Sequence, residues 1–216
     1  MLIGRNARPK AYIKPPYKGC VVVQGPTHQQ WLKAVRDSWE GYQIIFSTWD
    51  NTNRSLYNDS DIVIYNPIPS EAGTKNLNLQ KVSTINGLLK AKELGWTRAL
   101  KVRSDFSTTT ADGFFSLFDK DKLNFHAWWG SYITDFYMEG EIDDIINLFE
   151  VDVHGQYPEW HLTKKLYQSG LNTKSVCIVN KLINGRADIY WQPKQCWFSI
   201  HTSNKDVTDV LPQIWG

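Results

Sequence analysis

The sequence RALKVRSD, residues 98–105, is the strongest indication of the fold and of the place of the candidate site. Its apolar first part predicts a buried strand, which ends at Arg103 and Asp105. Residues two apart in a strand point to the same side. Ligands of open α/β sheets bind beyond the carboxyl ends of the strands, and an acidic group there can hold a divalent metal ion. We therefore expect Asp105 to be a metal ligand with Arg103 beside it; a salt-bridged strand end is the alternative.

Strand and helix patterns alternate before this stretch. Apolar runs predict strands over 19–24, 42–47 and 61–65, and apolar residues at helical spacing predict helices over 28–39 and 79–94. This alternation indicates an α/β fold with a mostly parallel central sheet flanked by helices, in a single domain. Later patterns are weaker, and they predict helices over 114–118, 142–149 and 158–169 and strands over 125–129, 131–137, 176–179 and 189–191.

Composition and charge exclude several classes of protein. The 24 basic and 22 acidic residues nearly balance, and no basic run gives a reason to expect a nucleic-acid partner. No run approaches the ~20 apolar residues of a transmembrane segment. Three cysteines without a CxxC pair argue against a zinc site and favour reduced thiols. Residues 1–18 are polar and proline-containing, which predicts an extended leader rather than a signal peptide. We expect a cytoplasmic protein, with a peripheral position at the membrane face left open.

Candidate binding residues follow the other predicted parallel strands. Gln24 and Gly25 end the first strand, and Trp49 and Asp50 end the second. Because the carboxyl ends of parallel strands meet at one edge, we expect these residues to share a pocket with residues 103–105. Glycine lets the backbone approach a ligand, and a tryptophan face can stack on a base. An ordinary turn, a core tryptophan and a solvated acid are the alternatives.

Two more candidates lie near these strand ends. Arg54, in a polar loop, is expected to pair with a diphosphate, and a free surface arginine is the alternative. Gln80 lies at the start of the helix that leads into residues 98–105. It is therefore expected to face the same cleft, although an amide there is frequently a helix cap.

Six short motifs, in this order, are similar to one known family. The chain resembles the WavE-type lipopolysaccharide-synthesis glycosyltransferases over residues 19–165. The order and spacing of the pieces carry the resemblance more than any one of them. The motifs are VVQGP (22–26), FSTW (46–49), NLQ (78–80) with ST (83–84) and GL (87–88), LKVRSD (100–105), TDFY (134–137) with Gly140, and PE (158–159).

The resemblance implies a GT-A-like, Rossmann-like fold, with a nucleotide-binding half over 19–106 and an acceptor half over 107–216. It implies metal-assisted transfer of a sugar from a nucleotide-diphosphate sugar, with UDP-sugar favoured, to a hydroxyl of a growing surface glycan or lipid-linked sugar. The metal would be Mn²⁺ or Mg²⁺, and inversion is favoured. One departure matters, because Arg103 occupies the place of the first acid in the common Asp-x-Asp motif. The implied nucleotide-sugar-binding residues are Gln24, Gly25, Trp49, Asp50, Arg54, Gln80 and Arg103.

The resemblance also implies roles for three later residues. Glu159, at the start of a predicted helix, is the expected catalytic base, and Asp135 is the second candidate. An acid favoured by the helix dipole is the structural alternative for Glu159. His201 is expected to reach back to the metal, since imidazole is a good ligand for manganese, although a structural histidine is the commoner case.

Two other functions stay open at the level of the sequence. A sugar nucleotidyltransferase would share the fold, but the turn at residues 24–27 has one glycine and no basic residue to grip a triphosphate. A non-catalytic carbohydrate-binding module would use the many aromatic residues. Such modules are mostly antiparallel β structures, which the alternation of strand and helix does not favour.

Overall fold

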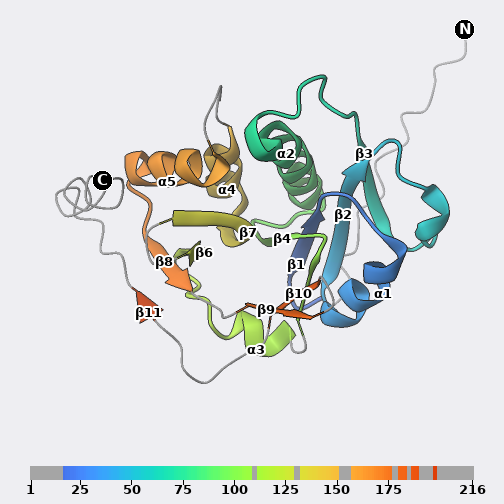
Figure 1. Cartoon of the computed structure of the whole chain (residues 1–216). Coiled ribbons are helices and arrows are strands. Elements are labelled where there is room, and N and C mark those ends of the chain that lie inside the picture. Colours follow the sequence, from blue (N-terminus) through green and yellow to red (C-terminus); the bar gives the residue numbers. More distant parts are fainter. Residues whose placement is uncertain are drawn as a thin grey trace, which may run out of the picture.

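A mixed β-sheet forms the centre of the protein. The computed structural model describes residues 17–108, 111–128, 132–150, 157–176, 180–183, 186–189 and 197–198. The sheet order is β11-β8-β6-β7-β4-β1-β2-β3, and β7 and β11 run opposite to the other strands. The expected α/β fold with a mostly parallel sheet is thus confirmed (Figure 1). The strands are β1 (Cys20–Gln24), β2 (Gln43–Trp49), β3 (Ile62–Asn66), β4 (Arg98–Arg103), β6 (Leu123–Trp128), β7 (Tyr132–Glu141), β8 (Thr173–Val176) and β11 (Trp197–Phe198).

Helices cover both faces of this sheet. Figure 1 shows α2, α4 and α5 on one side and α1 and α3 on the other. The alternation of side chains along β1 explains the two layers, because Cys20 and Val22 pack under α2 while Val21 and Val23 pack under α1. The helices are α1 (Gln29–Ser38), α2 (Leu77–Glu93), α3 (Ala111–Phe115), α4 (Ile142–Phe149) and α5 (Pro158–Ser169), with short 3-10 turns η1 (Arg54–Leu56) and η2 (Thr74–Asn76).

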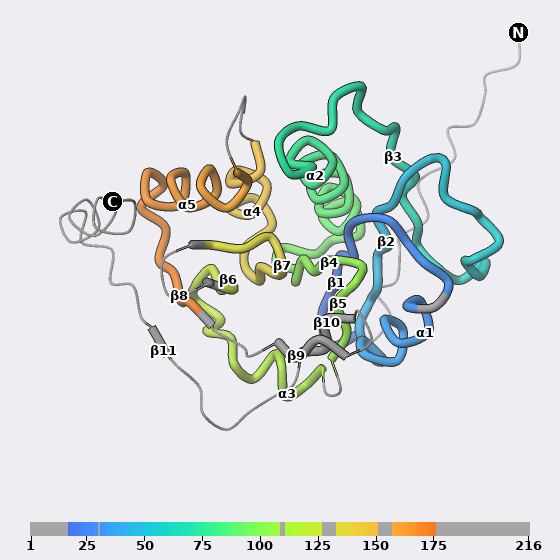
Figure 2. The backbone as a smooth tube through the Cα atoms, in the orientation of Figure 1, coloured from blue at the N-terminus to red at the C-terminus, as the bar shows by residue number. Residues whose placement is uncertain are grey.

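The path of the chain places β4 in the middle of the sheet. Figure 2 follows it from β1 through β2 and β3 to α2, and then back to β4 beside β1. A smaller second sheet contains β5 (Phe106–Thr108), β10 (Arg186–Ile189) and β9 (Asn180–Ile183), in that order. β5 directly follows residues 103–105, so those residues lie where the chain leaves one sheet for the other.

Several predicted boundaries were wrong. β7 continues to Glu141, beyond the expected end at 137, because residues 138–141 pair with β4 as far as Arg98↔Glu141. The helix expected over 114–118 is α3, three residues earlier, and β5, β9 and β11 were not predicted. Of the expected late strands, residues 177–179 and 190–191 lie outside the described residues, as do residues 1–16 of the expected leader. Among the helices that the structure describes, none is long and apolar enough to cross a membrane.

Helix α2 lies very close to the two strands that lead to the site. A Cβ on Gly87 would lie 2.4 Å from Val22 Cγ1 and 2.9 Å from Ser47 Cβ. Real Cβ atoms do not approach neighbours this closely, so only glycine permits this distance between the helix and the sheet. The motif GL at 87–88 is therefore explained by packing.

Gly87→Ala is expected to lower the free energy of unfolding by about 2 kcal/mol, the usual cost of overpacking a filled core. The measurement is urea unfolding followed by circular dichroism. Leu89→Ala on the same helix is the control, because Leu89 is 48% exposed and its loss should cost less than about 0.5 kcal/mol. Equal stability of Gly87→Ala and wild type would contradict the packing described above.

Candidate functional site

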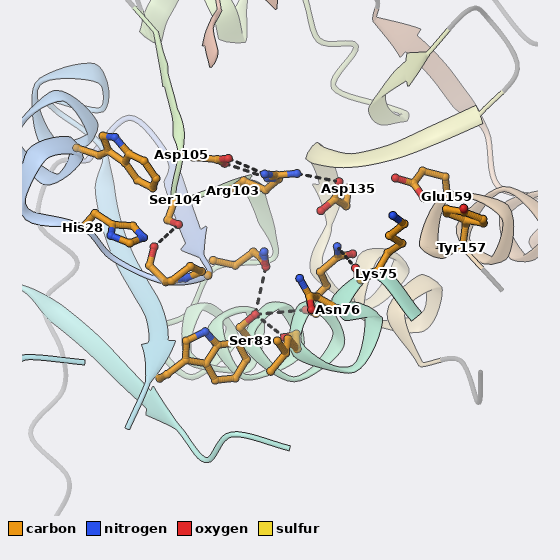
Figure 3. Close-up of a pocket in the computed structure, with 17 residues that line it drawn as sticks. His28, Lys75, Asn76, Ser83, Arg103, Ser104, Asp105, Asp135, Tyr157 and Glu159 are labelled. Carbon is orange, nitrogen blue, oxygen red and sulfur yellow. Dashed lines mark hydrogen bonds and ion pairs between the residues drawn. The ribbon is translucent and has the colours of Figure 1, made fainter. Parts of the chain in front are cut away.

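A cavity of about 490 Å³ lies beyond the carboxyl ends of β1, β2 and β4 (Figure 3). These three ends supply residues 24–26, Trp49 and residues 103–105, as the sequence predicted for a shared edge. The starts of α1, α2 and α5 and one residue of β7 complete the wall. The lining residues are Gln24, Gly25, Pro26, His28, Trp31, Trp49, Lys75, Asn76, Leu79, Gln80, Ser83, Arg103, Ser104, Asp105, Asp135, Tyr157 and Glu159.

Arg103 lies between two carboxylates at the centre of the cavity, as Figure 3 shows. Its Nε and Nη2 donate to Asp105 Oδ1 and Oδ2 at 2.9 and 2.5 Å, in the two-pronged geometry that suits a guanidinium. Its Nη1 is 3.6 Å from Asp135 Oδ1. The Asp135 side chain is 3% exposed, against 29% for Asp105. The bonds and charges of these acids raise the pKa of Arg103, although burial opposes them.

Lys101 lies beneath this cluster with no exposed surface. The ladder between β4 and β7 ends at Val102↔Tyr137, so the carbonyl of Asp135 lies past the last paired residues. Lys101 Nζ donates to this carbonyl, and it also lies 5.3 Å from the centre of the Phe149 ring. Burial lowers the pKa of Lys101 to about 8, although the charge of Asp135 opposes this shift. A buried lysine thus holds β7 where it leaves β4.

The low pKa of Lys101 predicts a pH dependence of stability. Between about pH 8 and 10.5 the unfolded chain still holds a proton that folded Lys101 has released, so a rise in pH stabilises the folded protein. Across this window the free energy of unfolding of wild type should rise by about 2–3 kcal/mol relative to Lys101→Met. Urea unfolding of both proteins at each pH measures the difference, in which the titration of other groups cancels. A constant difference would contradict the lowered pKa of Lys101.

Glu159 and Lys75 lie on the far side of Asp135 from Arg103 (Figure 3). Glu159 is in the first turn of α5, and burial, followed by the charge of Asp135, raises its pKa. The cations Arg103 and Lys75 act in the opposite direction. A carboxylate with a raised pKa in a cleft is suited to exchange a proton with a ligand.

The turn before α2 is strained. Lys75 and Asn76 have φ angles of 51° and 63°, in the left-handed region that residues with a side chain seldom occupy. Lys75 Nζ lies 5.7 Å from the centre of the Tyr157 ring, so the residues just before α2 and α5 face each other across the cavity. Strain of this kind collects at functional sites, where the surrounding structure holds it in place.

Three helices begin at the cavity. Their N-cap residues are His28 for α1, Asn76 for α2 and Tyr157 for α5, and all three line the cavity. None of these side chains bonds to the backbone of its own helix. The helix dipole favours anions at such ends, although the N–H groups of Leu77 and Asn78 at the start of α2 already donate to the carbonyls of Thr74 and Ala72, and α5 begins with Pro158, which has no N–H. Together with Arg103 and Lys75, these dipoles make the cavity suited to a phosphate-bearing ligand.

Hydrogen bonds fix the wall of the cavity that β1 and α2 supply. Ser83 Oγ donates to Gln24 Oε1 at 3.2 Å, and Ser47 Oγ donates to the carbonyl of Ser83 at 2.6 Å. Gly25 has a φ of 114°, and a Cβ there would lie 3.1 Å from Ser104 Oγ. The glycine is thus required by its backbone and by Ser104, a different reason from the approach to a ligand that the sequence suggested.

Of the predicted site residues that the structure describes, eight line the cavity and the others do not. Asp50 and Arg54 are exposed and do not line it, and the Arg54 guanidinium lies 4.5 Å from the centre of the Tyr65 ring. His201 lies outside the described residues. The eight are Gln24, Gly25, Trp49, Gln80, Arg103, Asp105, Asp135 and Glu159.

Several residues that line the cavity were not predicted from the sequence. His28 and Trp31 lie at the start of the helix after β1, a position that could have indicated them, but Trp31 also fits the apolar spacing that predicts this helix. No sequence signal pointed to Lys75 or Tyr157, since both depend on how the segments before α2 and α5 lie relative to one another.

A metal site of several protein ligands does not fit the described residues. Within them, no three His, Cys, Asp or Glu side chains gather as a metal-binding group. Asp105, the expected ligand, has both oxygens bound by Arg103. The role of His201 stays a prediction. Scans against protein-family models and curated proteins find no match to this chain.

Proposed function

We propose that the protein is a glycosyltransferase with a GT-A-like fold, which transfers a sugar from a nucleotide-diphosphate sugar to a hydroxyl of a glycan or lipid-linked acceptor. The single observation that carries the proposal is the cavity at the carboxyl edge of the sheet. In it, cations and helix starts that suit a diphosphate lie beside Glu159, a carboxylate whose pKa is raised. The resemblance in sequence supports the same function.

In the proposed reaction, the diphosphate lies near Arg103 and the helix starts, and the nucleoside lies towards Trp49. Glu159 takes the proton of the acceptor hydroxyl as its oxygen attacks the anomeric carbon. The new bond joins that oxygen to the sugar, the bond from the sugar to the diphosphate breaks, and the nucleotide diphosphate leaves with the electron pair. Arg103 and Lys75 stabilise the charge that develops on it. Asp135 is the second candidate for the base.

The two other functions receive less support. Helices on both faces of a mostly parallel sheet differ from the antiparallel layers expected of a carbohydrate-binding module. The turn after β1 presents no lysine or arginine for a triphosphate, which disfavours a nucleotidyltransferase. The preference for UDP, the surface-glycan acceptor and the cytoplasmic location stay predictions.

Calorimetry tests the proposed function. UDP, GDP, CDP, TDP and ADP are titrated into the protein, first with EDTA and then with manganese. We expect one nucleotide to bind more tightly than the rest, which would also identify the donor class. If no nucleotide binds under either condition, the glycosyltransferase proposal fails and a sugar-binding module becomes the better hypothesis.

A further inference from the structure

The carboxylates of the cavity centre are already neutralised by cations of this chain. Asp105 receives two hydrogen bonds from Arg103, and Asp135 lies 3.6 Å from the same guanidinium. Lys101, fully buried below them, adds a second positive charge, since it interacts electrostatically with both acids. Two acids therefore face two fixed cations, and a divalent metal is not needed to balance them.

A metal ion bound at Asp105 would have to share the carboxylate with Arg103. Each oxygen of Asp105 already accepts a hydrogen bond from the guanidinium, so a metal ion would use the remaining lone pairs beside a fixed positive charge that repels it. A metal ion that did displace Arg103 would break two charge-assisted bonds and move the guanidinium away from Asp135, which is almost fully buried. The described residues offer no group of three ligands to compensate for this loss.

Arg103, unlike the buried Lys101, lines the cavity and is placed to bind a diphosphate directly. A guanidinium has five N–H donors, and two of them bind Asp105, so others remain for phosphate oxygens. Lys75 supplies a second cation from the strained turn before α2, and Figure 3 places it across the cavity from Arg103. The start of α2 follows directly, and its dipole favours an anion, although the N–H groups of Leu77 and Asn78 already donate to the carbonyls of Thr74 and Ala72.

We propose that the protein binds its nucleotide diphosphate without a protein-bound divalent metal, and that Arg103 and Lys75 are the cations that contact the diphosphate. The inference rests on the proposed function, and it departs from the metal site that the sequence predicted at Asp105.

The first test compares the wild-type protein under two conditions. Each of the five nucleotide diphosphates is titrated calorimetrically with EDTA and with millimolar manganese chloride. The expected dissociation constants agree within about threefold. Binding that requires manganese, or tightens with it more than about tenfold, would overturn this inference but leave the proposed function standing. No binding under either condition would overturn both.

The second test uses manganese alone. Electron paramagnetic resonance of free Mn²⁺ is recorded while wild-type protein is added. The expected signal is unchanged at micromolar protein, because Arg103 occupies the oxygens of Asp105. Loss of the free-ion signal in proportion to the protein would show a metal site and would contradict the inference, whether the site includes His201 or not.

The third test removes one cation. Lys75→Met should weaken binding in EDTA about tenfold, because a charge-assisted contact to phosphate is lost. Lys33→Met is the matched control, since the side chain of Lys33 is 84% exposed on α1 and does not line the cavity. Equal affinity of Lys75→Met and wild type would remove Lys75 from the site.

Arg103→Lys tests whether the guanidinium of Arg103 contacts the diphosphate. It keeps the charge next to Asp135 and loses the two-pronged geometry. The expected affinity in EDTA is lower by about tenfold, with an unchanged circular dichroism spectrum. Wild-type affinity of Arg103→Lys in EDTA would contradict direct binding by the guanidinium fork.

Discussion

Replacing Glu159 with glutamine is expected to reduce turnover by about 10²- to 10⁴-fold, the usual contribution of a general base. The amide keeps the shape of the side chain but cannot accept the proton of the acceptor. Nucleotide affinity should stay within about twofold of wild type, because the diphosphate is bound by the cations rather than by this acid. The measurement is release of nucleotide diphosphate from the donor that calorimetry identifies.

The pH dependence of turnover provides a second test of Glu159 as the base. Burial and the charge of Asp135 raise the pKa of Glu159, so turnover should fall as the pH decreases through this raised value, where the base becomes protonated. The residual activity of Glu159→Gln should lack this fall. Glu93→Gln is the control, because the side chain of Glu93 is 68% exposed on α2. Retained turnover in Glu159→Gln would move the base to Asp135 or elsewhere.

Asp135→Ala is expected to lower the free energy of unfolding by about 3 kcal/mol, as is usual when one partner of a buried ion pair is removed. The hydrogen bond from Lys101 goes to the backbone carbonyl of residue 135 and is retained. The loss therefore comes from charge, because Asp135 is the main group that opposes the effect of burial on the pKa of Lys101. Urea unfolding at neutral pH measures it.

Two comparisons show whether charge is the cause. Asp135→Asn keeps the shape and should be destabilised to a similar degree, whereas a loss only in Asp135→Ala would indicate packing. Asp37→Ala is the exposed control, since the side chain of Asp37 is 62% exposed and its pair with Lys33 should contribute less than about 1 kcal/mol. A stability of both Asp135 variants equal to wild type would contradict the charge cluster described here.

The sequence predicted the parallel part of the sheet and the meeting of its strand ends. The apolar runs of β1, β2 and β4 and the helical spacing in α1 and α2 are local signals, and the shared edge follows from them by topology. The sequence therefore predicts that Gln24, Trp49 and Asp105 share one cavity, and all three line it.

What the sequence could not predict depends on contacts between distant segments. The pairing of Arg103 with both Asp105 and Asp135 requires β7 to return antiparallel beside β4 and then to leave it. Lys75 reaches the site because its backbone is in the left-handed region, a conformation that a lysine in the sequence does not indicate. The prediction for Arg54 was wrong for a local reason, because its guanidinium contacts the ring of Tyr65 outside the cavity.

Hydrogen–deuterium exchange with and without the tightest-binding nucleotide tests the central claim most directly. If the cavity at the carboxyl edge of the sheet is the binding site, protection should concentrate in residues 24–31, 75–83, 103–105 and 157–160. A second cavity lies at the opposite edge, near Lys18, Tyr42 and Trp96. Protection confined to that cavity, with no change at residues 103–105, would contradict the proposed site.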